Sequence, residues 1–192
     1  MPEPSKKRTK AFSTPAKFAI WLEANHAVES ELWLKIYKKE SCKKTINWEE
    51  AVVEALCWGW IDGVKKSLDA EAYLQRFTPR RSGSNWSKRN REHVERLIVA
   101  GRMQEPGLVH VRAAKADGRW DAAYAPASEM TIPDDFLQAL ERRPKAKQFF
   151  ATLNKTNLYS IGYRLATAMK PETRQRWFDK ILTMLENGEK FH

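Results

Sequence analysis

One short stretch, "WGWID" at residues 58–62, places two tryptophans and an aspartate within five residues. Aromatic rings line many small-molecule pockets, and a carboxylate beside them could act as a base, so Trp58, Trp60 and Asp62 could form a pocket. The alternative is that both tryptophans belong to the core and that Asp62 orients an arginine. We favour the core interpretation, because large aromatic side chains at a junction between a helix and a strand usually pack.

A second stretch, residues 76–102, holds eight lysines and arginines against two glutamates, so it carries a net charge of +6 out of the +10 of the whole chain. Within it a Ser-Gly-Ser turn precedes a predicted helix, and the N–H groups at a helix N-terminus attract anions. Arginine adds paired hydrogen bonds to phosphate or carboxylate groups. The stretch therefore predicts an anion-binding site with an indole on its wall, formed by Arg76, Arg80, Arg81, Ser84, Trp86 and Ser87.

The alternative for this stretch is a solvated basic helix face, since most charged side chains simply face water. In that interpretation Asp62 pairs with Arg76 or Arg80 and orients the guanidinium group. If the two strands that carry these residues pair, Asp62 could face Arg76 across the ladder as a cross-strand ion pair.

Few residues suggest metal or nucleophilic chemistry. The two cysteines do not form a Cys-x-x-Cys pair, the four histidines are scattered, and two cysteines alone cannot make a zinc site. The motifs of phosphate-cradling loops, zinc proteases, dinucleotide-binding folds and serine hydrolases do not occur. We therefore expect no metal, no cofactor and no catalytic residue, and we expect Cys57 to be a small buried hydrophobe rather than a nucleophile.

The composition indicates a globular protein with a partner of opposite charge. Hydrophobic residues make up 42% and charged residues 30% of the 192 residues, which is enough to build a core. The charge of +10 favours a small anion or a polyanion such as nucleic acid. No stretch approaches the roughly 18 apolar residues of a membrane span, and the first apolar run is too short for a secretion signal. We expect a cytoplasmic protein with reduced thiols.

Periodicity and capping residues predict an α+β fold, with a small antiparallel sheet packed by helices and followed by a C-terminal helical domain. Strand patterns occur at residues 31–39, 60–69 and 72–81, and helix patterns surround them. The predicted core includes Trp48, Val52, Leu56, Trp60 and Leu97. The predicted domains are a flexible basic tail at 1–12, an α+β domain at 13–120, a linker at 121–132 and a helical domain at 133–192.

Four stretches of this sequence occur in the same order in a known family. "EALCWGWIDG", "RFTPRR" and "WSKRN", followed by "AMKPETRQRW" near the C-terminus, resemble the YdeI/OmpD-associated family, also called the bacteriocin-protection family. The resemblance runs from about Phe18 to about Gly188. It implies a link to bacteriocin protection or stress response, and it implies neither a required cofactor nor a set of catalytic residues.

The function that we expect is therefore that of a non-catalytic cytoplasmic binding protein with an anion-binding surface. One alternative is an enzyme that acts on a small anionic substrate held by Arg76, Arg80 and Arg81. The other alternative is a nucleic-acid-binding protein, which a steep dependence of binding on salt would distinguish, since phosphate contacts release counterions.

Overall fold

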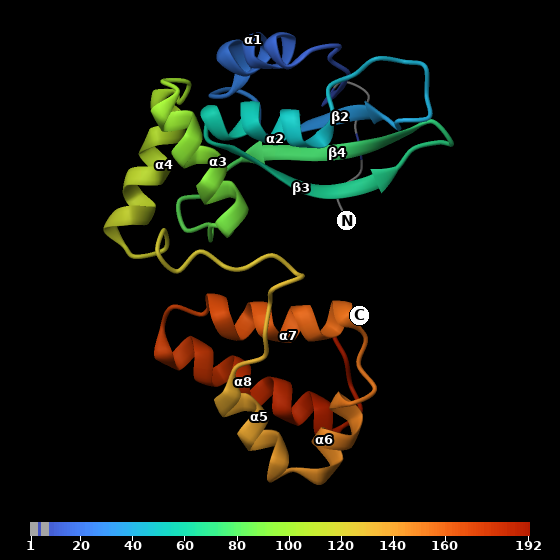
Figure 1. Ribbon diagram of the computed structural model, residues 1–192, viewed down its shortest axis with the longest axis vertical. Helices are drawn as coiled ribbons and strands as arrows, with labels where there is room; N and C mark the ends of the chain where they lie inside the picture. Colours follow the sequence, from blue (N-terminus) through green and yellow to red (C-terminus); the bar gives the residue numbers. More distant parts are fainter. Residues whose placement is uncertain (1–3, 5–7) are drawn as a thin grey trace. The chain divides into compact units, whose positions relative to one another are not determined.

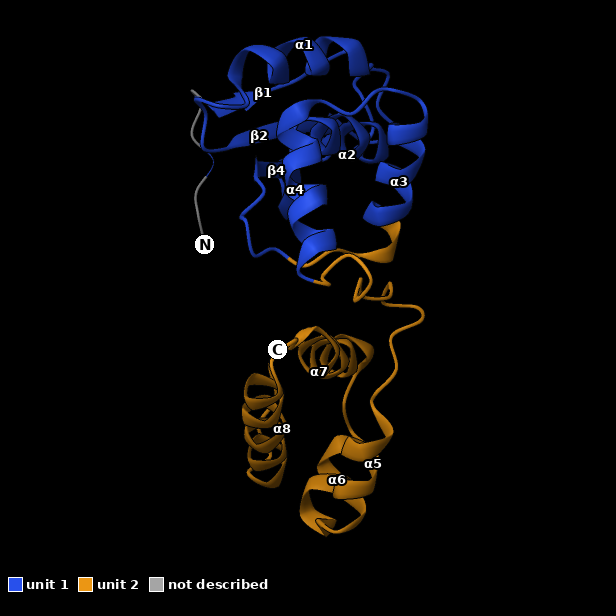
Figure 2. Cartoon of the chain, turned by 90° about the vertical axis from the view of Figure 1, so that its left-hand side faces the viewer, with its two compact units in different colours: residues 1–84, 90–117 blue, residues 85–89, 118–192 orange. Residues whose placement is uncertain are grey.

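A computed structural model of the chain describes Pro4 and residues 8–192 (Figure 1). The chain forms two compact units (Figure 2). Unit 1 comprises residues 1–84 and 90–117, and unit 2 comprises residues 85–89 and 118–192. A four-stranded sheet lies in unit 1, and unit 2 is built mainly from helices. The predicted α+β class is confirmed.

The sheet contains β1 (Thr9–Lys10), β2 (Leu32–Tyr37), β3 (Trp60–Ser67) and β4 (Ala72–Pro79), in the order β1-β2-β4-β3. The three long strands are antiparallel, as predicted, whereas β1 runs parallel to β2. β1 lies within the predicted flexible tail, because the outer edge of β2 offers backbone groups with which an extended segment pairs. The rest of that predicted tail includes residues 1–3 and 5–7, which lie outside the described residues.

Two helices, α1 (Pro15–Asn25) and α2 (Trp48–Cys57), cover one face of this sheet (Figure 1). Local capping defines where both begin. The Thr14 side chain accepts a hydrogen bond from a backbone N–H in the first turn of α1, and Asn47 and Glu50 form a reciprocal capping box on α2. Apolar side chains of these helices pack against the sheet. For example, Phe18 of α1 packs edge-on against Phe77 of β4, with 5.8 Å between the ring centroids.

Of the predicted core residues, Val52, Leu56, Trp60 and Leu97 are buried, which confirms them. Trp48 is only half-buried, because it stands in the first turn of α2 and its indole N–H reaches toward the sheet. None of the helices in the described part of the chain combines the length and the apolar character that a membrane span requires.

Two further helices, α3 (Lys88–Val99) and α4 (Glu105–Ala116), are joined by a short turn. Gly101 makes that turn possible, since its φ of 64° lies in the left-handed region that favours glycine. The N-terminus of α4 lies against the C-terminus of α2, where the backbone N–H of Gln104 donates to the carbonyl of Cys57 at 3.1 Å. This contact brings the turn between α3 and α4 next to the end of α2.

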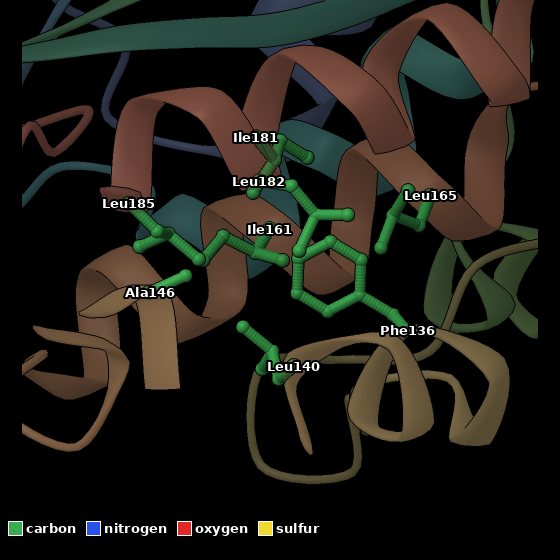
Figure 3. Close-up of a cluster of buried hydrophobic side chains, with 8 residues drawn as sticks. All are labelled: Phe136, Leu140, Ala146, Ile161, Leu165, Ile181, Leu182 and Leu185. Carbon is green, nitrogen blue, oxygen red and sulfur yellow. The ribbon is translucent and has the colours of Figure 1, made fainter. Parts of the chain in front are cut away.

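Unit 2 contains α5 (Asp134–Glu141), α6 (Pro144–Phe150), α7 (Lys155–Thr167) and α8 (Pro171–Glu186). Apolar side chains from all four helices form one core (Figure 3). The predicted linker at 121–132 is part of this unit. Met130 and Thr131 lie against Gly162 of α7, where an added Cβ atom would stand 2.9 Å from Cγ of Met130 and 3.0 Å from the carbonyl oxygen of Thr131. The core residues are Phe136, Leu140, Ala146, Ile161, Leu165, Ile181, Leu182 and Leu185.

Candidate ligand-binding cleft

The three residues of the "WGWID" stretch point to three different environments. Trp60 is 1% exposed and its indole N–H donates to the carbonyl of His26 at 3.1 Å, so its place in the core is confirmed. The Asp62 carboxylate accepts a hydrogen bond from the indole of Trp48 at 3.0 Å. Trp58 is half-buried, and its ring lies 4.7 Å from that of His26. The structure therefore does not gather these three residues into one pocket.

Gly59 is the physical reason for this separation. Its φ of 72° ends α2 in a left-handed conformation, and its N–H donates to the carbonyl of Leu56 at 3.2 Å. A Cβ atom at this position would lie 2.8 Å from the carbonyl oxygen of Pro106, so the close approach of α4 also requires glycine. Trp58 thus belongs to the helix end, whereas Trp60 is the first residue of β3.

Trp58 lines an open cleft of about 760 Å³ within unit 1. The cleft lies among α1, the C-terminal half of α2 and the turn between α3 and α4. Its apolar wall includes Ile20, which is 65% exposed although it is a large aliphatic side chain. The polar side chains of the cleft come from separate elements, namely Thr14 directly before α1, Glu23 on α1, Glu54 on α2, and Arg102 and Gln104 in the turn. Polar and apolar groups therefore share the lining of the cleft about equally, a mixture that can bind the charged and the apolar parts of one small molecule.

The main electrostatic feature of the cleft is an ion pair between Glu54 and Arg102. The Glu54 residue is only 8% exposed, and its Oε1 atom lies 2.6 Å from Nη2 of Arg102. A buried carboxylate without a partner would cost several kcal/mol, so this arginine compensates it. The Arg102 side chain is 46% exposed. Because a guanidinium group has five N–H donors, Arg102 can bind Glu54 and still donate to a carboxylate or phosphate in the cleft.

Cys57 also lines the cleft but has little nucleophilic character. Burial is the largest of the effects that raise the pKa of its thiol, to about 11. The thiol therefore stays protonated at neutral pH, whereas the thiolate is the reactive form. The prediction of a small buried hydrophobe is confirmed. Among the described residues, no group of three or more histidine, cysteine, aspartate or glutamate side chains is placed to hold a metal ion.

The predicted ion pair between Asp62 and Arg76 is wrong. In the ladder, Asp62 lies opposite Phe77, so it shares a face with Phe77, whereas Arg76 points to the other face of the sheet. The partner of Arg76 is Glu31, whose Oε2 atom lies 2.7 Å from the arginine Nε. A difference of one residue in register moves a side chain across the sheet, and the sequence pattern did not define the register here.

Glu31 shows the electrostatic consequence of this pairing. Burial by itself would raise the pKa of its carboxyl, but hydrogen bonds and charges from Arg76 and Arg8 outweigh burial, so the pKa lies below its ordinary value. The Arg8 guanidinium lies 3.3 Å from the second carboxylate oxygen. Arg76, a member of the predicted anion site, thus forms a structural ion pair at the sheet.

The remaining residues of the predicted anion site are divided between the two units. Arg80, Arg81 and Ser84 belong to unit 1, where Arg80 is buried and Arg81 is exposed. Trp86 and Ser87 belong to unit 2. An anion site formed by all six residues, like the alternative pair between Asp62 and Arg80, stays a prediction.

In unit 2, Trp86 is 2% exposed and its ring packs edge-on against Trp120 at 4.9 Å between centroids. Ser87 lies directly before α3 and forms an isolated bridge with Tyr124. The surroundings of Trp86 are those of a core side chain, in which an indole packs against another ring rather than facing solvent.

Sequence reasoning missed most of the residues that line the cleft. One available signal was Glu54, a charged residue among the buried positions of α2, where it lies near Ala51 and Ala55. A carboxylate at such a position indicates a partner from elsewhere in the chain. Arg102 was counted in the basic stretch but was not separated from its neighbours, because its role depends on a contact with a residue 48 positions away.

Comparison with known families agrees with the division into units. Residues 10–110, which are 101 of the 192 residues, match the family described as Domain of unknown function (DUF8412). The chain belongs to the DUF8412 family. Every residue named above as lining the cleft lies within this DUF8412 match.

The C-terminal part matches a second family. Residues 129–188 match the family described as Bacteriocin-protection, YdeI or OmpD-Associated, which confirms the suspected resemblance for that part of the chain. The "AMKPETRQRW" stretch lies in this match, whereas the three earlier stretches lie in the DUF8412 match. No curated protein and no solved structure matches the chain.

Proposed function

We propose that this DUF8412-family chain is a non-catalytic binding protein whose cleft holds a small ligand with a carboxylate, an amino group and an apolar part. A free amino acid or a short peptide has this chemistry. The observation that carries the proposal is the half-exposed guanidinium of Arg102, which the buried carboxylate of Glu54 holds at the cleft.

Each part of such a ligand finds a matching group in the cleft. Arg102 offers N–H donors to the carboxylate, and hydrogen bonds to charged groups contribute about 1.5–3 kcal/mol each. Glu23 is exposed on α1 and offers a carboxylate to the amino group. Trp58 and Ile20 supply apolar surface for the rest of the ligand. The two acidic groups outnumber the single arginine, so a zwitterion suits the cleft better than a simple anion does.

Isothermal titration with three related compounds tests this assignment. Phenylalanine carries both charges, N-acetylphenylalanine lacks the cationic amino group, and phenylalaninamide lacks the carboxylate. We expect phenylalanine to bind most tightly, and we expect Arg102→Gln and Glu23→Gln each to weaken its binding by about tenfold or more. Arg112→Gln is the matched control, because this exposed arginine pairs with Glu105 on α4 and neither residue lines the cleft.

Two results would contradict the proposal. One is that none of the three compounds binds to the wild-type protein at millimolar concentration. The other is that Arg102→Gln binds phenylalanine as tightly as Arg112→Gln does. The non-catalytic part of the proposal has its own test, in which mass spectrometry recovers each bound compound unchanged after long incubation with the protein. Conversion of any of them would favour the enzyme alternative.

The proposal extends to protection against bacteriocins in the cytoplasm. It is supported by the description of the family that matches residues 129–188 and by the two free thiols, Cys42 and Cys57. Expression of the full chain in a bacteriocin-sensitive bacterium should raise survival above that of cells with an empty vector. Equal survival of the two cultures would count against this role, and recovery of the protein outside the cytoplasmic fraction would count against the location.

A further inference from the structure

In unit 2, residues 188–192 fold back from the end of α8 and lie beside α7 (Figure 1). Gly188 makes this reversal possible, since its φ of 71° lies in the left-handed region. Of the four residues that follow, Phe191 is half-buried and the other three are exposed. We call residues 189–192 the end segment. The contacts of this segment with α7 and α8 form a site that is separate from the cleft.

One buried amide binds the backbone of the end segment. Asn157, in the first turn of α7, is 1% exposed. Its Oδ1 atom accepts hydrogen bonds from the backbone N–H groups of Phe191 and His192, both at 3.1 Å, and its Nδ2 group donates to the carbonyl of His192 at 3.4 Å. All three contacts are with main-chain groups, which every extended peptide offers apart from proline. Asn157 can therefore bind a peptide backbone largely independently of its sequence.

A side-chain site on the same two helices favours an aromatic ring. The guanidinium carbon of Arg164 lies 3.9 Å from the centroid of the Phe191 ring and 5.3 Å from that of Trp177, so it makes cation–π contacts with both. The rings of Trp177 and Phe191 meet edge-on at 6.4 Å between centroids. Nη1 of Arg164 also donates to the carbonyl of Ser160 at 2.9 Å, which holds the guanidinium in place. We call Asn157, Arg164 and Trp177 the peptide seat.

The fit of the end segment to the core below it is incomplete. A hollow of about 10 Å³ remains between the segment and apolar side chains of α7 and α8, which include Ile161, Ile181 and Leu185. Atoms that line such a gap lack contact partners on one side. Because the segment buries one ring only partly and its other side chains are exposed, we expect it to detach at a lower free energy than that of global unfolding.

We propose that the peptide seat binds an extended segment of a partner protein that carries an aromatic residue, and that the end segment occupies this seat as an internal competitor. Main-chain hydrogen bonds that give affinity, combined with a site for one side chain that gives specificity, are a recurring mode of peptide recognition. The end segment shows which chemistry fits: two consecutive backbone N–H groups for Asn157 and a ring for Arg164 and Trp177.

The position of the family match agrees with this division of roles. The three residues of the peptide seat lie within residues 129–188, which match the bacteriocin-protection family, whereas the end segment lies outside this match. A segment tethered by a short linker has an effective concentration in the millimolar range. The partner therefore has to overcome this competition, and release of the end segment makes the seat available.

Fluorescence anisotropy on the full chain tests the proposal. The probe is the labelled tetrapeptide Glu-Lys-Phe-His, which has the sequence of the end segment and a blocked C-terminus. The variant Phe191→Ala weakens the internal competitor and leaves the peptide seat unchanged. Met169→Ala is the matched control, because it removes a 50% exposed apolar side chain from the same unit. We expect Phe191→Ala to bind the probe at least about tenfold more tightly than Met169→Ala does.

Two altered probes test which groups the seat recognises. Glu-Lys-Ala-His lacks the ring, and Glu-Lys-Phe-Pro lacks one of the two N–H groups that Asn157 binds. We expect each to bind Phe191→Ala at least about tenfold more weakly than the original probe does. Equal affinity of the alanine probe and the original probe would overturn the proposal. Absence of binding to Phe191→Ala at millimolar probe, or equal binding to the two protein variants, would also overturn it.

Displacement can also be followed in the wild-type chain, which does not depend on the stability of any variant. In ¹⁵N-labelled protein, millimolar unlabelled probe should move the backbone signals of Phe191 and His192 to the positions of a free segment, and unchanged signals would overturn the proposal. Free phenylalanine should not displace the probe, and full displacement would place the probe in the cleft instead. A dimer of the wild type that grows with concentration in sedimentation would assign the seat to a second copy rather than to a partner protein.

Discussion

Replacement of Gly107 by alanine is a sharp test of the packing that forms the cleft. Gly107 lies in the first turn of α4, against the C-terminus of α2. A Cβ atom at this position would lie 2.7 Å from the carbonyl oxygen of Leu56 and nearer still to that of Cys57. Both atoms belong to the backbone of a helix, so neither can rotate away as a flexible side chain would.

Two opposing effects determine the magnitude. Alanine is favoured over glycine inside a helix by about 1 kcal/mol, which by itself would stabilise the variant. Overpacking against a fixed core typically costs 1–3 kcal/mol, and here two backbone oxygens must move and weaken the hydrogen bond from Gln104 to Cys57. Because the Cβ atom would meet two backbone oxygens at less than 3 Å, we expect a clash near the upper end of this range, about 3 kcal/mol, and therefore a net loss of about 2 kcal/mol in the free energy of unfolding.

Urea unfolding followed by circular dichroism measures this loss. Gly83→Ala is the control, because an added Cβ atom there meets no atom within 4 Å and no left-handed φ is involved. We expect the control to stay within about 0.5 kcal/mol of the wild type. A Gly107→Ala protein as stable as the wild type, or more stable, would refute the close approach of α2 and α4.

Three further predictions follow from individual side chains. Trp60→Ala should lower the free energy of unfolding by about 3–5 kcal/mol in urea titration, the range for large buried aromatics, and a loss below about 1 kcal/mol would contradict its place in the core. A disulfide reagent at mildly alkaline pH should modify the exposed Cys42 quickly and Cys57 only after unfolding, because burial raises the Cys57 pKa to about 11; two fast thiols would contradict this. Burial by itself would raise the pKa of Glu31, but its contacts with Arg76 and Arg8 lower this pKa in the folded protein. The ionised form of Glu31 therefore stabilises the fold at pH values above the pKa that its carboxyl has in the unfolded chain. The stability difference between wild type and Glu31→Gln should therefore be constant near neutral pH and shrink below about pH 4, and a difference that grows on acidification would refute the assignment.

Much of the fold of unit 1 could be predicted from the sequence, because the signals that define its elements are local. Asn47 and Glu50 form the capping box that begins α2, and Gly59 ends it. Period-two and extended patterns in the sequence predicted three long strands, which the structure contains as β2, β3 and β4. Each of these signals acts over a few residues, so it can be recognised without the rest of the chain.

The register of the sheet could not be predicted in the same way. A bulge between Asp62 and Lys65 shifts the pairing of β3 with β4, so simple alternation along β3 fails beyond this point. The same uncertainty produced the wrong pairing of Asp62 with Arg76. β1 was also missed, because its two residues are a strand only through their pairing with β2.

The sequence by itself determined the class of the fold, the helix ends, the buried state of Trp60 and Cys57, and the excess of positive charge. Only the tertiary structure decided that Trp58 lines a cleft and that Arg102 compensates the buried carboxylate of Glu54. The physical reason is that each of these groupings joins side chains from elements far apart in the chain. Their meeting depends on how closely α1, α2 and α4 pack, and no local pattern specifies this.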